Sequence, residues 1–289
     1  VSIIDFLSAE EARAFLERLV IPPEEDVSPV TLLQGVCKML YRSNALKGTF
    51  REIGGFQWIF RFYAKWEWSA ESVPSEGVDA QKFDIMEWCF LSMIYAMKGS
   101  RDNREHFDDS YGRRELSMLV TNSAYLTDVM KGTYAERLCC LLIAVAFEIP
   151  DVEKVRSLGV FGNPTGTAPI YHPFVLLPLL VILKKTLPVD KQRAIIKFLS
   201  IMARDNANVQ KMTSDRVTST LLDEYLDGIV DVSSPIHEEA STFCAQLMSY
   251  MVSTQDVRML LQAMKKQPYD VGVLRCLLDA TVKSERNGS

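Results

Sequence analysis

The chain has 289 residues, of which 48% are hydrophobic and 24% are charged, and its net charge at pH 7 is −5. These values are typical of a globular protein with enough apolar side chains for a continuous core. The net negative charge argues against a protein that binds the phosphate backbone of nucleic acids. It also gives no reason to expect a polybasic surface that binds anionic lipid. The longest apolar runs, Leu138–Phe147 and Phe174–Leu183, are about half of the ~20 residues that a membrane span needs, so we expect buried helices there.

Helical patterns follow one another along the chain. A first helix is expected within residues 1–21, where Pro22-Pro23 ends it, and Ser28-Pro29 starts the next. An aromatic helix is expected at Gly55–Trp68, and a polar turn between helices is expected around residues 102–109. Alternating β-type runs with hairpin turns are absent, so the predicted fold class is all-α. Further helices are expected at residues 80–98, 113–119, 125–130, 133–147, 173–186, 189–204, 217–226, 235–252, 254–266 and 269–282.

Three segments of the sequence resemble one another. The windows Leu46–Ile59, Asn103–Leu116 and Asn208–Leu221 align without gaps, and each follows a long predicted helix. Their starts lie 57 and 105 residues apart, so the second spacing is close to twice the first. A shortened unit at Glu148–Phe161 fits the empty place. The fifth and fourteenth residues of each window are apolar: Phe50, Phe107 and Met212, then Ile59, Leu116 and Leu221.

A period of about 50 residues is slightly longer than the ~40–47 residues of HEAT and armadillo units. One such unit cannot bury its own apolar face, so stacked neighbours must provide the core. We therefore predict one armadillo/HEAT-like α-solenoid domain over residues 1–289, with residues 1–21 as an N-terminal capping helix. Its repeat units are expected at residues 28–68, 80–130, 133–161, 173–227 and 235–283.

The turn Phe50-Arg51-Glu52-Ile53-Gly54-Gly55-Phe56 after a long helix resembles the armadillo-like segments of large BEACH-domain proteins, the family of beige, neurobeachin and the autophagy-linked FYVE protein. The same order of a helix, an Asn-containing polar segment and a second helix recurs twice. It recurs around Asn103-Arg104, Phe107 and Tyr111-Gly112, and in Leu176–Leu226 with Asp205–Gln210. The resemblance spans Thr31–Leu226, and the portions that define the family are absent. It implies a scaffold segment of a large cytoplasmic protein in vesicle trafficking or autophagy, without catalytic residues.

Residues that bear chemistry are few and scattered. His106 lies among carboxylates, but no second histidine stands nearby, so we expect no metal and no cofactor. With three histidines and no nucleophile motif, a catalytic site has little support, although a cryptic hydrolase assembled from distant residues stays open. The cysteines lie in apolar runs and are expected to be reduced core residues: Cys37, Cys89, Cys139, Cys140, Cys244 and Cys276.

The aromatic helix at Gly55–Trp68 is the candidate partner-binding element. Two apolar faces indicate a helix packed inside the stack, and the alternative is an exposed aromatic anchor. The residues expected to bind are Arg61, Lys65 and Trp68, which suit an acidic-aromatic peptide. We therefore predict a non-enzymatic scaffold that binds proteins or peptides and no nucleic acid.

Two other functions stay open. The first is an armadillo-type GTPase-binding regulatory region such as that of a formin, and the second is the cryptic hydrolase. Because the chain begins with Val1 rather than Met, we expect a fragment of a longer protein. That protein is expected in the cytoplasm, with any association with endomembranes left to its other parts.

Overall fold

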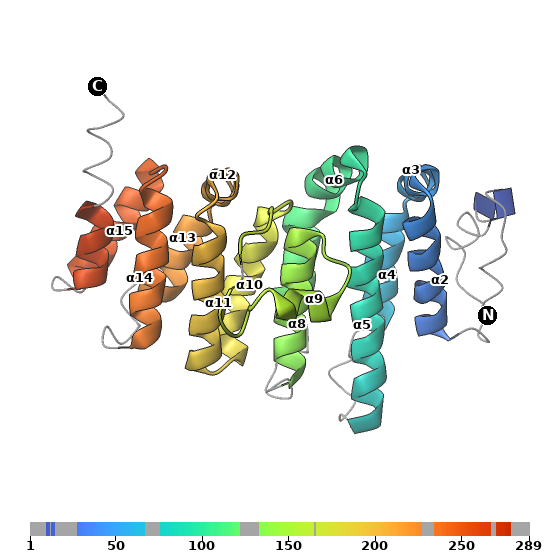
Figure 1. Ribbon diagram of the computed structural model, residues 1–289, viewed down its shortest axis with the longest axis horizontal. Coiled ribbons are helices and arrows are strands. Elements are labelled where there is room, and N and C mark those ends of the chain that lie inside the picture. The colour runs from blue at the N-terminus through green and yellow to red at the C-terminus, as the bar shows by residue number, and fades with distance from the viewer. Residues whose placement is uncertain are drawn as a thin grey trace. The chain divides into compact units, whose positions relative to one another are not determined.

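A computed structural model describes the chain at residues 10–11, 13–14, 28–66, 76–121, 133–164, 166–226, 234–266 and 270–278. Within these ranges the regular elements are helices and no strand occurs, which confirms the predicted all-α class (Figure 1). No helix of the described ranges is both long enough and apolar enough to cross a bilayer. The N-terminal capping helix predicted for residues 1–21 falls almost wholly outside the described residues.

The chain divides into two compact units. The first comprises Val1–Met130 with Glu148–Asp151, and the second comprises Lys131–Phe147 with Val152–Ser289. Both are built in the same way, from long helices that pack side by side and shorter helices that connect them.

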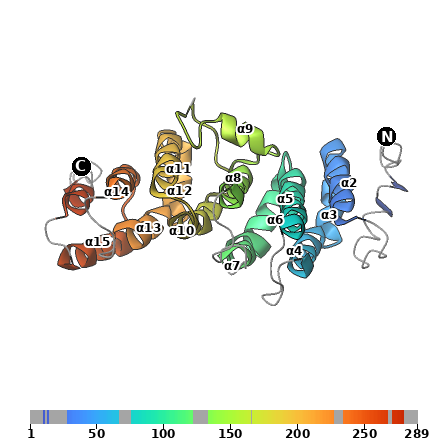
Figure 2. The ribbon, with the colours of Figure 1, turned by 90° about the horizontal axis from the view of Figure 1, so that it is seen from below.

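In the first unit, the long helices α2 and α5 run in the same direction. Cys37 of α2 meets Ser92 of α5, with 3.2 Å between Sγ and Oγ, and Tyr41 meets Tyr95 one turn further along both helices. Figure 2 shows α2 and α5 in one row and α4 in a second row. The elements are α2 (Pro29–Arg42), α3 (Asn44–Glu52), α4 (Gly55–Trp66), α5 (Glu76–Met97), α6 (Arg101–Phe107), the π-helix η2 (Asp108–Leu116) and α7 (Ser117–Thr121).

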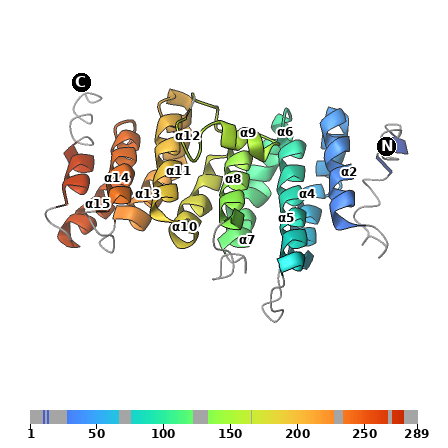
Figure 3. The same cartoon turned by 60° about the horizontal axis from the view of Figure 1, so that its bottom comes forward.

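The second unit repeats this parallel packing. Arg193 pairs with Glu239 and Ser200 bonds Gln246, so α11 and α14 advance together (Figure 3). Its elements are α8 (Thr133–Phe147), α9 (Val152–Ser157), the 3-10 helix η4 (Pro173–Val175), α10 (Leu176–Thr186), α11 (Val189–Met202), α12 (Asn206–Ser214), α13 (Val217–Leu221), the π-helix η5 (Leu222–Leu226), α14 (Pro235–Met248), α15 (Thr254–Lys266) and a helix at residues 271–278.

The apolar run of α8 is completely buried. All ten residues of Leu138–Phe147 are at most 3% exposed, as expected for a helix that is apolar on every side. Each large side chain among them contributes about 1.5–3 kcal/mol through burial. Phe147 packs against Phe198 of α11 with ring centroids 5.9 Å apart.

The three aligned windows occupy equivalent places in the two units. Each begins three residues after a helix N-cap, where the side chain of Ser43, Ser100 or Asp205 accepts a hydrogen bond from the window's first backbone N–H. The fifth and fourteenth residues of all three windows are at most 1% exposed. The shortened unit at Glu148–Phe161 departs from this pattern, because its fifth and fourteenth residues, Val152 and Phe161, are only half-buried.

One predicted turn is wrong. Residues 102–109 are helical, since α6 continues directly into η2. In the first window the ninth residue is Gly54, whose φ of +78° breaks the chain between α3 and α4. The ninth residue of the second window is Tyr111, whose side chain packs on Phe56 and Phe60. A tyrosine adopts positive φ at a cost, so the helix runs on through this position.

Candidate functional site

The residues predicted to bind a partner lie on or just beyond α4. Arg61 is exposed, whereas the side chain of Lys65 and the whole of Trp68 fall outside the described residues. Both aromatic faces of α4 contain buried residues, since Phe56, Phe60 and Phe62 are at most 7% exposed. The described part of α4 is therefore packed within its unit, and the role of Arg61, Lys65 and Trp68 stays a prediction.

The second unit brings a serine, a histidine and an aspartate together. His237 Nε2 lies 2.9 Å from the Asp270 carboxylate, and Ser241 follows one turn after His237 on α14. Ser241 Oγ donates to the carbonyl of Glu238, and the other Asp270 oxygen accepts from the N–H of Gly272 at the start of the helix at residues 271–278. All three side chains are at most 4% exposed. These bonds attach that helix to α14, and they do not present Ser241 Oγ to a substrate.

Within the first unit, a buried ion pair joins Arg104 of α6 to Glu148, the first residue of the segment Glu148–Asp151. Arg104 donates two hydrogen bonds to the Glu148 carboxylate, one of them from Nη2 at 2.7 Å, and the Glu148 side chain is 2% exposed. Lys47 lies in the same region, where burial lowers its pKa against the opposing charge of Glu148. Such a cluster satisfies buried charges within the fold. Among the described residues, no group of three or more His, Cys, Asp or Glu could hold a metal ion.

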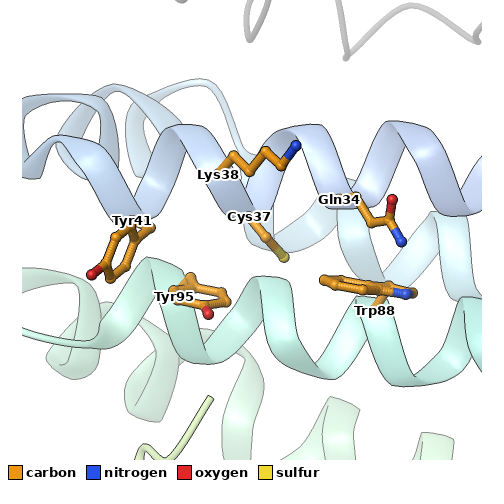
Figure 4. A pocket seen from close by; sticks show the side chains of 6 residues that line it. All are labelled: Gln34, Cys37, Lys38, Tyr41, Trp88 and Tyr95. Atoms are coloured by element: carbon orange, nitrogen blue, oxygen red, sulfur yellow. The ribbon is translucent and has the colours of Figure 1, made fainter. Parts of the chain in front are cut away.

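One site with a geometry suited to binding is an open groove on the first unit, between α2 and α5. Its volume is about 190 Å³, and we call it the aromatic groove. Because α2 and α5 are parallel, the residues that line it form matched pairs along the two helices. They are Gln34, Cys37, Lys38 and Tyr41 of α2 and Trp88 and Tyr95 of α5 (Figure 4).

The walls of the aromatic groove are rings at its two ends. Tyr41 and Tyr95 meet edge to face, with centroids 5.9 Å apart, while Trp88 lies beside Gln34 (Figure 4). Tyr41 is 73% exposed and is therefore held at the surface without being covered. An edge-to-face pair contributes ~0.5–1.5 kcal/mol beyond its buried area, so this position of Tyr41 is supported by its neighbour.

The floor of the aromatic groove is neutral and fixed by hydrogen bonds. Cys37 Sγ points into the space between the rings of Tyr95 and Trp88 and lies 3.2 Å from Ser92 Oγ. Ser92 Oγ in turn donates to the carbonyl of Trp88 at 2.7 Å. Burial raises the pKa of the Cys37 thiol to about 12, so the thiol is protonated and unreactive at neutral pH. Burial also raises the pKa of the Tyr95 phenol.

Sequence reasoning missed the aromatic groove. The residues that face each other across the groove lie 54 positions apart in the sequence, both for Gln34 and Trp88 and for Tyr41 and Tyr95. A signal was present in the 57-residue spacing of the first two windows, which predicts that the helices before them are neighbours. Pairing those two helices at that spacing would have placed Tyr41 beside the end of the second helix, close to Tyr95.

Comparison with known proteins adds no relative. No protein-family model matches the chain, and no curated protein matches it.

Proposed function

We propose that this chain is a non-catalytic scaffold that binds other proteins or peptides. The observation that supports this most is the aromatic groove, where Tyr41 and Trp88 present ring surface on a floor of buried side chains. Aromatic residues on a rigid support are the residues that dominate binding energy in protein interfaces. Parallel helices provide that support, since helices expose side chains at fixed spacing.

We further propose that the fold is an armadillo-like α-solenoid. Parallel packing of successive long helices within each unit supports it, as do the equivalent N-caps of the three windows. In such a stack, equivalent helices of successive repeats form the binding surface. By the resemblance of Thr31–Leu226 alone, we propose that the chain is a segment of a BEACH-family protein acting in vesicle trafficking or autophagy.

Affinity capture from cell lysate tests the scaffold proposal. Wild-type chain, Tyr41→Ala and Tyr250→Ala are immobilised, and captured proteins are quantified by mass spectrometry. Tyr250 is the matched control, because it is an exposed aromatic residue of the second unit at 41% exposure. We expect at least one protein to be captured by wild type and Tyr250→Ala and to be at least tenfold depleted with Tyr41→Ala.

Identical captured sets for all three chains would contradict a role for the aromatic groove. A small GTPase among the groove-dependent proteins would favour the formin-like regulatory region. Covalent labelling of the folded chain by broad serine- or cysteine-directed activity probes would favour a hydrolase, since no described cysteine is exposed.

A further inference from the structure

We infer that the aromatic groove binds a linear peptide segment that presents an aromatic ring beside acidic residues. This inference rests on the proposed function and specifies the chemistry of the partner. It follows from the size of the groove, from the placement of its rings and from the charge at its rim.

The size and ring placement select one large flat side chain. Trp88 and Tyr95 are seven residues apart on α5, about 10 Å along the helix axis. Cys37 Sγ lies at the floor between them (Figure 4). The groove volume of about 190 Å³ exceeds the ~150 Å³ of an apolar cavity that accepts benzene, so one phenyl ring enters it. Two neighbouring rings then offer edge and face contacts to the incoming ring.

The floor selects an apolar group at this position. Cys37 is 3% exposed and its thiol is occupied by Ser92. Gln34 is the single amide in the lining, and it lies at the Trp88 end. A polar side chain placed over Cys37 would lose hydrogen bonds to water without replacing them. An aromatic ring over Cys37 loses no hydrogen bonds to water, because it makes none.

The rim selects negative charge. Lys38 is the single charged residue of the groove lining, it is exposed, and it makes no ion pair within the described part of the chain. Helix α2 has no acidic residue, and its other charged residue, Arg42, is also an exposed cation. On α5, the stretch from Trp88 to Met97 has no charged residue. The lining itself has no anion, and the negative charge of Asp151 acts on Tyr95 at the other end of the groove from Trp88. A carboxylate next to the bound ring therefore meets Lys38.

Fluorescence anisotropy with a synthetic probe tests this inference on the full chain. The probe is a fluorescein-labelled peptide of sequence GSEDFEDSG, compared with one in which Phe is replaced by Ala and one in which every Asp and Glu is replaced by Asn or Gln. The protein variants are Tyr41→Ala and Lys38→Glu, both at exposed positions, with Lys197→Glu as a control that makes the same charge change on an exposed lysine of α11. Circular dichroism confirms that each variant is folded.

We expect saturable binding that weakens at least fivefold with Lys38→Glu, with Tyr41→Ala and with either altered peptide, and less than twofold with Lys197→Glu. Equal binding of the Asn/Gln peptide would overturn the charge requirement, and equal binding of the Ala peptide would overturn the ring requirement. Lack of saturation with the wild-type chain would overturn the peptide chemistry. Groove-dependent capture from lysate would then still support the scaffold, whereas loss of both results would reject the scaffold as well. A dimeric chain that becomes monomeric with Tyr41→Ala would identify a second copy as the occupant and reject the inference.

Discussion

At the scale of single residues, two buried asparagines at equivalent positions of the repeat make equivalent hydrogen bonds. Asn103 and Asn208 are the first residues of their windows, and both are at most 1% exposed. Each side-chain amide donates to a backbone carbonyl at the end of the preceding helix, Ala96 for Asn103 and Met202 for Asn208. Asn208 also holds the connection between α9 and η4, because it accepts from the N–H of Ile170. The alignment found the position of these residues, but not their partners.

Asn208→Ala is expected to lower the free energy of unfolding by about 3 kcal/mol. The change leaves the carbonyl of Ala168 and the N–H of Ile170 without this partner, and it removes one hydrogen bond to the Met202 carbonyl, which still accepts from the N–H of Asp205. Each unpaired buried group costs roughly 1–3 kcal/mol. Urea denaturation followed by circular dichroism measures the loss. Asn163→Ala, at an exposed position of the same connection, should change stability by less than about 0.5 kcal/mol. Equal effects of the two changes would show that the Asn208 bonds are dispensable.

The buried thiols predict a dependence of stability on alkaline pH. Burial raises the pKa of Cys37 to about 12 and of Cys140 to about 11, from the ordinary thiol value of 9.0. The folded state therefore keeps protons that the unfolded state loses above pH 9, so stability is complete below pH 9 and falls as pH rises from 9 to 11. Cys140→Ala should remove about 2 kcal/mol of that fall. A fall identical to that of wild type, measured by urea denaturation at pH 8 and pH 11, would contradict this account.

At the scale of elements, helices were predictable and their junctions were not. The sequence predicted Thr254–Lys266 with the bounds that α15 has, because its apolar stripe has an uninterrupted helical period. It failed at residues 102–109, where polar side chains indicated a turn although Asn103 and Phe107 are buried and hold α6 in the core. Tertiary packing keeps this junction helical, and the helix propensities of single residues carry no information about that packing.

Substitutions at the ninth residue of two windows are expected to change the free energy of unfolding in opposite directions. Both residues have a positive φ, +64° at Arg216 and +78° at Gly54. The side chain of Arg216 is exposed. Arg216→Gly should raise the free energy of unfolding by up to ~1 kcal/mol, because glycine adopts this conformation without the cost of a Cβ. Gly54→Ala should lower it by ~1 kcal/mol for the same reason. Thermal denaturation in which both changes destabilise the chain would contradict the equivalence of the two positions.

The attachment of the helix at residues 271–278 depends on one carboxylate. Asp270→Ala removes both the N-cap bonds to Gly272 and Val273 and the partner of His237, so the expected loss is about 3 kcal/mol. Asp270→Asn keeps an acceptor for the cap and should lose about half as much. Hydrogen exchange measured by mass spectrometry should show faster exchange at residues 271–278. Unchanged protection there in Asp270→Ala would show that packing alone holds this helix.

At the scale of the whole molecule, the sequence predicted a helical protein that binds partners, but it did not locate the groove. The residues chosen from the sequence, Arg61, Lys65 and Trp68, came from one aromatic helix, whereas the groove needs side chains of two helices. Tyr41 and Trp88 gave no local signal, because isolated aromatic residues occur in many helices. Their meaning depends on the parallel register of α2 and α5, which only the fold supplies.

Photo-crosslinking in cells tests the central claim most directly. A benzophenone amino acid replaces Tyr41, or Tyr250 as the control, and crosslinked proteins are identified after irradiation. We predict that position 41 crosslinks to a different protein through a segment containing an aromatic residue beside Asp or Glu, and that Lys38→Glu reduces the yield of this product at least fivefold. Crosslinking at position 41 that is no stronger than at position 250, or that joins only two copies of this chain, would contradict the claim that the aromatic groove binds a partner.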